Sequence, residues 1–125
     1  MRRIIAIAVL ALVVLVSGVT VVAVTVTDVY NAPNPLVTET TFYLVYYPMP
    51  HVFHSIVIKV YALGGQQVAQ PYAKDTDRVT WDGTDFNGNN LANGVYLYKV
   101  YVWQLVNGWP TLIFESNVKT MAILR

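Results

Sequence analysis

The chain has 125 residues, of which 55% are hydrophobic and 12% are charged, and its formal net charge is +1 at pH 7. This length suits one domain, and the apolar composition excludes a disordered chain. The chain has no cysteine, which excludes disulfides and cysteine-ligated metals. The lysines and arginines form no basic patch in the sequence, so no nucleic-acid partner is expected.

The N-terminal segment is a long uncharged stretch behind two basic residues. Arg2 and Arg3 precede residues 4–26, which contain no charged side chain. As a helix of about 23 residues at about 1.5 Å each, the stretch would reach roughly 34 Å, enough to cross a bilayer core. Residues 1–23 are therefore predicted to be a signal peptide or an uncleaved transmembrane anchor, with a helix over residues 4–23.

A signal peptide and a transmembrane anchor both place the rest of the chain on the same side of the membrane. Because basic residues stay in the cytoplasm, the rest of the chain is expected on the periplasmic or extracellular side. An anchored domain would contact the membrane through residues 4–26, and a cleaved one would be secreted or lie at the cell surface.

From about residue 24 the sequence shows short alternating segments separated by turn residues. Apolar side chains share one face in each of three segments: Phe42, Leu44 and Tyr46; Ile56, Ile58 and Val60; Tyr96, Tyr98, Val100 and Val102. The predicted strands are residues 23–30, 39–47, 54–63, 66–69, 78–82, 95–105 and 111–124. About seven short strands at this spacing predict an all-β antiparallel sandwich over residues 24–125.

Several motifs of the β region together form a recognisable pattern. They are Asn31-Ala32-Pro33-Asn34-Pro35, Glu39-Thr40-Thr41, Ile56 to Val60 with Tyr61, Gly65 and Val68, Trp81-Asp82-Gly83-Thr84-Asp85 with Asn87-Gly88, Gly94-Val95-Tyr96-Leu97-Tyr98, and Lys119 to Arg125. With these motifs the sequence resembles the immunoglobulin-like module of flagellar hook-capping proteins and the related C-terminal sorting domains of type IX secretion cargo. Leu36 stands where the family usually has an aromatic residue. The resemblance implies an immunoglobulin-like (fibronectin type III-like) sandwich and an extracytoplasmic location.

The dense turn after Trp81 is the most distinctive of these elements. Its fold-defining residues are expected to be Trp81, Asp82, Gly83, Asp85, Gly88 and Gly94. Asp85, Asn87 and Asn89 have the D-x-N-x-N spacing of a calcium loop, but an EF-hand also needs Gly at position six and Glu at twelve. Asn90 and Tyr96 occupy those positions. A turn stabilised by its own Asp and Asn side chains is preferred over this weak calcium candidate.

No residue set has the pattern of a catalytic site. No acidic residue lies near His51 and His54 in the sequence. Pro50 disfavours a helix there, so the spacing of the two histidines does not place them on one helix face. Asp75 and Asp77 flank Thr76 in a polar segment typical of a solvated loop. We therefore expect no enzyme activity, no cofactor and no metal.

Aromatic side chains are the strongest candidates for a partner interface. If they face outward together, they form an adhesive surface for proteins; the alternative is burial within the domain. The leading hypothesis is a non-enzymatic, membrane-anchored accessory subunit that packs on partner proteins. Two alternatives are a self-assembling filament subunit that donates residues 19–29 as a strand, and a secreted carbohydrate- or surface-binding module. The candidate interface residues are Tyr43, Tyr47, Tyr61, Tyr101, Trp103 and Trp109.

Overall fold

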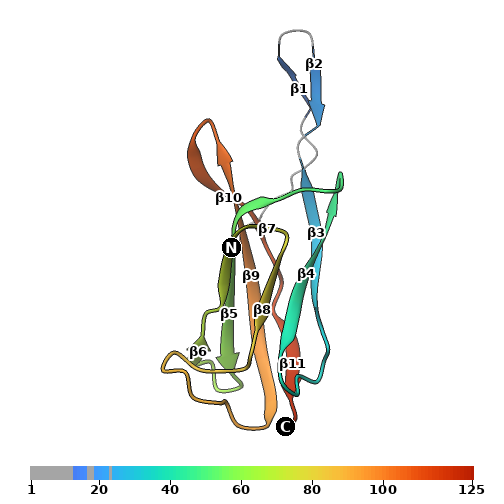
Figure 1. Ribbon diagram of the computed structural model, residues 1–125. Coiled ribbons are helices and arrows are strands. Elements are labelled where there is room, and N and C mark those ends of the chain that lie inside the picture. Colours follow the sequence, from blue (N-terminus) through green and yellow to red (C-terminus); the bar gives the residue numbers. More distant parts are fainter. Residues whose placement is uncertain (1–12, 17–18, 23) are drawn as a thin grey trace.

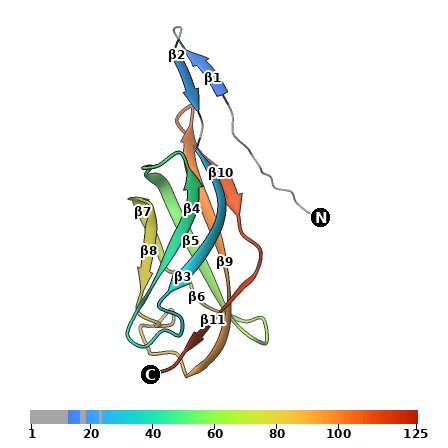
Figure 2. The same ribbon diagram turned by 90° about the vertical axis from the view of Figure 1, so that its right-hand side faces the viewer.

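The computed structural model describes residues 13–16, 19–22 and 24–125, and from residue 25 onward these form two antiparallel sheets packed face to face (Figures 1 and 2). The three-stranded sheet has the order β3-β4-β8. The six-stranded sheet has the order β10-β9-β5-β6, with β11 also paired to β9 and β7 also paired to β5. The strands are β3 (Thr25–Ala32), β4 (Thr40–Tyr47), β5 (Phe53–Ala62), β6 (Gln67–Ala69), β7 (Tyr72–Thr76), β8 (Arg78–Trp81), β9 (Gly94–Val106), β10 (Trp109–Glu115) and β11 (Lys119–Ile123).

The core lies between the two sheets and uses the alternating apolar positions that the sequence indicates. All ten side chains predicted to face inward on β4, β5 and β9 are buried. Rings from opposite sheets meet edge to face: Phe42 and Tyr98 have centroids 4.9 Å apart, and Tyr46 and Phe53 have centroids 5.2 Å apart. The prediction of an all-β sandwich is confirmed.

The described part of the chain has two more strands after residue 24 than the seven predicted. β7 covers Tyr72–Thr76, whose sequence alternates poorly and carries two charges. The last predicted strand is divided into β10 and β11 at Ser116, whose Oγ accepts the backbone N–H of Val100 at 2.9 Å. Ser116 also donates its own N–H to the Val100 carbonyl at 2.9 Å. These two hydrogen bonds hold Ser116 against β9, and regular pairing with β9 begins again at Lys119.

The segment between β3 and β4 ties the two sheets together at one end. Leu36 is fully buried and forms an isolated parallel bridge with Ile123. Its N–H donates to the Ala122 carbonyl at 2.8 Å, and Asn34 Oδ1 accepts the Ala122 N–H at 3.0 Å. The proline-rich motif thus fastens β11 of the larger sheet to the smaller sheet.

The N-terminal part of the chain forms two short strands where it is described. β1 (Val13–Val16) and β2 (Val19–Val22) pair antiparallel with each other. Much of the helix predicted over residues 4–23 lies outside the described residues, so that part stays a prediction. Among the described residues, no helix is long and apolar enough to span a membrane. In the predicted donor strand over residues 19–29, Thr25 to Val29 pair with β4 of the same chain.

Candidate interaction surfaces

The turn after β8 is organised by two aspartates that bind their own backbone. The indole Nε1 of buried Trp81 donates to the Thr84 carbonyl at 3.1 Å. Asp82 Oδ1 accepts the Thr84 hydroxyl at 2.6 Å, and Asp85 Oδ1 accepts the N–H groups of Asn87 and Asn89 at 2.8 and 3.0 Å. These are the Asx-type bonds expected of a self-stabilised turn.

The same geometry bears on the calcium candidate. One carboxylate oxygen of Asp85 already accepts two backbone donors, so it faces the inside of the turn. Within the part of the chain that the structure describes, no group of three or more His, Asp or Glu side chains comes together as a metal site would require. The preference for a self-stabilised turn over a calcium site at Asp85, Asn87 and Asn89 stays a prediction.

Arg125 locks the turn to the C-terminal strand, a role that the sequence did not reveal. Its guanidinium donates to the carbonyls of Gly83 at 2.9 Å, Val37 at 3.2 Å and Asp82 at 3.3 Å. Gly83 has φ of +77°, and a Cβ built on it would lie 2.5 Å from Arg125 Nη2. Glycine is therefore required at this position both for its backbone conformation and for the close approach of the arginine.

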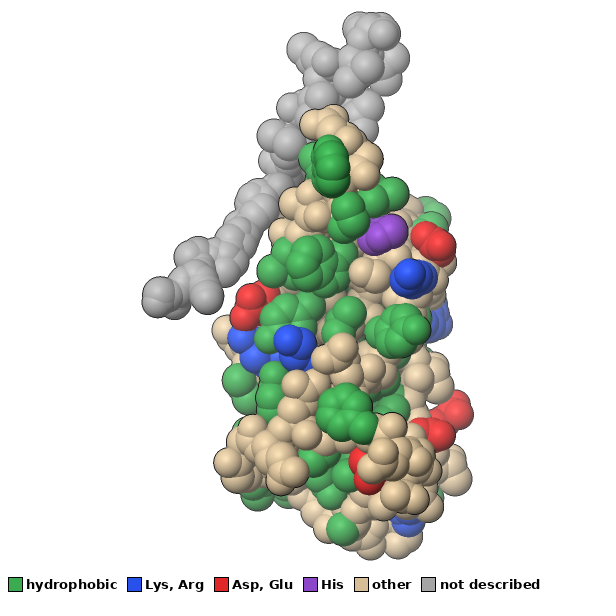
Figure 3. Space-filling view, turned by 90° about the vertical axis from the view of Figure 1, so that its left-hand side faces the viewer, with side chains coloured by type: hydrophobic (Ala, Val, Ile, Leu, Met, Phe, Trp, Pro, Cys, Tyr) green, Lys and Arg blue, Asp and Glu red, His purple; other side chains and the backbone are tan. Residues whose placement is uncertain are grey.

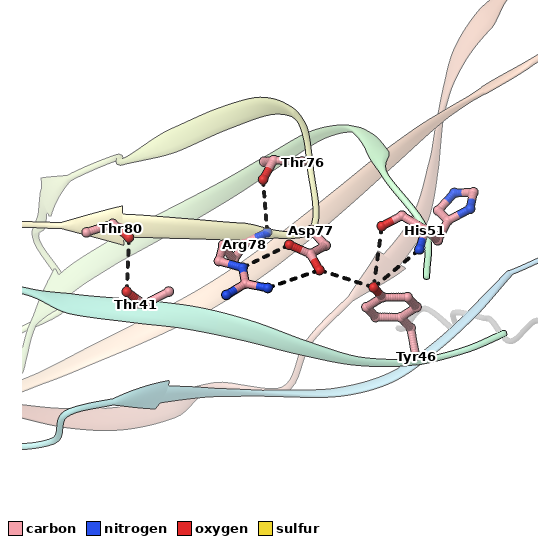
Figure 4. A network of polar contacts seen from close by, with 7 residues as sticks. All are labelled: Thr41, Tyr46, His51, Thr76, Asp77, Arg78 and Thr80. Atoms are coloured by element: carbon pink, nitrogen blue, oxygen red, sulfur yellow. Dashed lines mark hydrogen bonds and ion pairs between the residues drawn. The ribbon is translucent and has the colours of Figure 1, made fainter. Parts of the chain in front are cut away.

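His51, His54 and Asp77 belong to a structural network, and Figure 4 shows the part of it around His51 and Asp77. The Tyr46 hydroxyl donates to Asp77 Oδ2 at 3.2 Å and accepts the His51 N–H at 3.4 Å. The Gln104 side chain contacts the His51 ring through its Nε2 and accepts the His54 N–H at 3.1 Å. These contacts join the ends of β4, β5, β8 and β9.

The surroundings of Asp77 and His51 in this network each favour one charge state. The hydrogen bond from the Arg78 guanidinium to Asp77, at 2.9 Å, holds the pKa of Asp77 below its usual value. Burial lowers the pKa of His51, which favours its neutral form. Asp75 is exposed and does not join Asp77 in a site. A carboxylate held ionised by an arginine is poorly suited to donate a proton.

The six aromatic interface candidates lie in three separate places rather than on one surface. Tyr43 and Tyr47 are on the outer face of the three-stranded sheet, and Trp109, 75% exposed, is in the β9–β10 hairpin. The other three candidates alternate with buried residues of the six-stranded sheet and occupy its outer face; they are Tyr61, Tyr101 and Trp103.

The outer face of the six-stranded sheet carries a continuous set of aromatic side chains, here called the aromatic face: Tyr61, Tyr72, Tyr101 and Trp103. The strand register aligns Tyr72, Val57 and Tyr101 in one row across β7, β5 and β9. Trp103 lies in the next row, opposite Ser55 and Leu112. Figure 3 views the molecule from this side and shows hydrophobic side chains along its length, interspersed with charged ones.

Two lysines stand at the centre of the aromatic face. Lys59 and Lys99 are directly opposite each other on β5 and β9. Their Nζ atoms lie 4.9 and 5.6 Å from the centroid of the Tyr101 ring. Lys99 also forms an ion pair with Glu115. Like charges directly opposite on neighbouring strands repel each other, and Glu115 and Tyr101 offset this repulsion within the chain.

The smaller sheet has an aromatic cluster of its own on the outer face. Tyr30 stacks on Tyr43 with centroids 5.3 Å apart, and the Arg78 guanidinium carbon lies 5.3 Å from the Tyr43 centroid. Tyr30 and Tyr72 were missed as surface aromatics. Tyr30 alternates with buried Val29 and Asn31, so its outward position could be read from the period of β3.

The comparisons with known proteins identify the fold only. No protein-family model matches the chain, and no curated protein matches it. Among solved structures, part of dimeric latent PorU from Porphyromonas gingivalis is similar, with a TM-score of 0.60 and 24% identity. This likeness covers 83% of the chain and 10% of PorU.

A second, more distant likeness is to part of PorZ. PorZ is an essential bacterial surface component of the type IX secretion system of the same organism. The TM-score is 0.45 with 24% identity, over 78% of the chain and 11% of PorZ. The chain thus spans about a tenth of the length of either structure. It shares a β-sandwich fold with a portion of PorU.

Proposed function

We propose that the chain is a non-enzymatic, extracytoplasmic structural subunit that packs against a partner protein through its aromatic face. The supporting observation is the pair Lys59 and Lys99 over Tyr101, in the middle of outward-facing aromatics. Opposed lysines repel each other, and within the chain Glu115 already pairs with Lys99 while Tyr101 lies beside both ammonium groups. A partner with an acidic group near Lys59 meets a surface whose charge is complementary to its own.

The remainder of the aromatic face suits a protein partner. Tyrosine and tryptophan are enriched at protein interfaces because they combine a large apolar surface with a polar group. Tyr72 is 63% exposed, and Trp103 is half-buried beside exposed Leu112. A carbohydrate would instead stack on an open ring face, but lysine ammonium groups stand over the Tyr101 ring. This arrangement favours a protein with acidic and apolar groups over a glycan.

The uncharged N-terminal stretch supports a position at a membrane. Arg2 and Arg3 before residues 4–26 are typical of a segment that enters the membrane from the cytoplasmic side. A two-stranded hairpin leaves outer backbone groups unpaired, which lipid does not tolerate. Anchoring therefore requires residues 4–23 to take the predicted helical form in the bilayer, and to differ there from the β1–β2 pair. Circular dichroism of the full chain, in water and in vesicles, measures this change.

The docking proposal is tested by photo-cross-linking from both sheets of the full chain in its native cells. A photoreactive residue replaces Trp103 or Tyr72 on the aromatic face, and the matched control replaces Thr80 on the outer face of the other sheet. We expect a discrete product from the aromatic face, absent from the control position. Products of equal yield from both sheets, or none from the aromatic face, contradict the proposal.

Lys59→Glu distinguishes binding from folding. The substitution removes the lysine pair and places a carboxylate opposite Lys99, which already pairs with Glu115, so stability should change by no more than a few tenths of a kcal/mol. The cross-linked product should nevertheless be lost, because the acidic group of the partner meets a negative charge. If stability is unchanged and cross-linking is also unchanged, the lysine pair has no part in binding. Quenching of Trp103 fluorescence by a polysaccharide would instead favour a glycan ligand.

A further inference from the structure

One end of the sandwich is built from three stretches without charged side chains and exposes large apolar ones. Three stretches meet there: residues 24–27 at the start of β3, residues 45–53 between β4 and β5, and residues 104–113 around the β9–β10 hairpin (Figure 1). None of them contains Asp, Glu, Lys or Arg. Burial lowers the pKa of His51, the one titratable histidine of these stretches, so it too favours its neutral form.

The exposed side chains of this end are here called the apolar end: Tyr47, Met49 and Val52 of the β4–β5 connection, and Leu105, Val106 and Trp109 of the hairpin. Tyr47 and Met49 are each 72% exposed and Trp109 is 75% exposed. The opposite end of the sandwich carries the Asp- and Asn-rich turn, Glu39 and Arg125. The molecule is thus polar at one end and apolar at the other.

The N-terminal stretch joins the domain at the apolar end. Thr25 already pairs with Tyr47, the last residue of β4, so no linker separates residues 4–23 from this part of the sandwich. If the proposed membrane anchor is correct, this short connection brings the apolar end directly to the bilayer. Tryptophan and tyrosine prefer the membrane–water interface, where their rings are apolar on one side and hydrated on the other.

Charged groups border this end: Asp28 on β3 lies opposite Val45, and Asp77 accepts the Tyr46 hydroxyl at 3.2 Å. The β7–β8 turn around Asp77 reaches less far than the β4–β5 connection and the hairpin (Figures 1 and 2). Asp77 is paired with Arg78. If the apolar end faced a bilayer, these charged groups would lie farther from the acyl chains than the apolar end, at the level of the lipid headgroups.

We propose that the apolar end lies in the interfacial layer of a lipid bilayer, with Trp109, Tyr47 and Met49 among the headgroups and upper acyl chains. This proposal rests on the membrane anchor of the proposed function. It adds that the domain itself touches lipid, and it fixes which end does so. The strands then stand away from the membrane, and the polar turn after β8 is distal.

Quenching by brominated lipid tests the proposal on the full chain. The chain is reconstituted in phosphatidylcholine–phosphatidylglycerol vesicles whose bromines lie near the top of the acyl chains. One tryptophan of three is expected at the interface, so total emission should fall by up to about a third. Trp109→Phe should abolish this quenching, and the matched control Trp103→Phe should retain it.

A second variant separates contact with lipid from loss of folding. Met49 is exposed, so Met49→Glu should leave the unfolding midpoint unchanged while its negative charge, repelled by the anionic headgroups, reduces the quenching of Trp109. If the chain floats with vesicles but Trp109 is not quenched, lipid contact by this end is refuted and the anchor stands. If the chain does not float, the anchor itself is refuted. Protection of Trp109 from aqueous acrylamide without quenching by brominated lipid would show a protein on this end and overturn the proposal.

Discussion

The contact between Gly83 and Arg125 predicts a specific non-additive effect on stability. In Gly83→Ala the new methyl group would lie 2.5 Å from Arg125 Nη2 and 3.2 Å from Leu36 Cδ2. The guanidinium must therefore leave the carbonyls of Val37, Asp82 and Gly83. The variant also places alanine at φ of +77°, which side chains with a Cβ adopt at a cost.

The magnitudes follow from the two parts of this change. The positive φ costs about 1 kcal/mol, judged from the penalty of the left-handed region. The three hydrogen bonds contribute about 2 kcal/mol together, because Arg125 is exposed and each bond is worth about 0.5–1 kcal/mol. We expect Gly83→Ala to cost about 3 kcal/mol and Arg125→Ala about 2 kcal/mol. The double variant should also cost about 3 kcal/mol, so the coupling is about 2 kcal/mol.

Urea unfolding of the full chain in mild detergent measures these differences. The slope m should be the same in all variants, so that midpoints report stability. Gly88→Ala is the matched control, since Gly88 has φ of +82° and nothing within 4 Å of a built Cβ. It should cost about 1 kcal/mol, with or without Arg125→Ala. A double variant of Gly83 and Arg125 that loses the sum of its single losses would refute the reasoning.

Three further predictions concern the core, the pH response and calcium. Phe42→Ala removes a fully buried ring that contacts Trp81 and Tyr98 and should cost about 3–5 kcal/mol in thermal unfolding; a loss of less than about 1.5 kcal/mol would contradict the described core. The folded-state pKa of His51 is depressed, so the unfolded chain takes up a proton more readily, and stability should fall as pH drops below 6.5. His51→Gln should reduce this fall between pH 7 and 5, and an identical pH slope would contradict the assignment. Millimolar calcium should leave the unfolding midpoint unchanged, because Asp85 already accepts two backbone donors. If the turn did bind calcium, a calcium concentration 100 times the dissociation constant would raise the free energy of unfolding by about 2.7 kcal/mol and refute this prediction.

The core could be predicted from the sequence because its strands alternate with period two. Ile56, Ile58 and Val60 are all fully buried, as their spacing predicts. β7 was missed because its segment is polar and because Asp75 takes φ of +53°, which alternation does not reveal. β7 forms because the tertiary fold brings this segment beside β5, whose backbone groups it pairs with.

The candidate surfaces were harder to predict because they depend on how strands are paired. The sequence shows that Tyr43 and Tyr101 alternate with core residues, but not that they lie on opposite sheets. The row of Lys59 and Lys99 exists only through the register of β5 and β9, which are about forty residues apart in the chain. Arg125 likewise finds its carbonyl partners only once the turn after β8 has folded.

The two proposed contacts make a combined prediction about orientation. β9 has 13 residues and spans about 43 Å at about 3.3 Å per residue, from the polar end to the apolar end. The aromatic face runs along this length, so a partner bound there stands beside the domain while Trp109 stays at the membrane. We expect cross-linking from position 103 and quenching of Trp109 by brominated lipid in the same sample. If the partner abolishes the quenching, it covers the apolar end instead, and the two contacts compete for one surface.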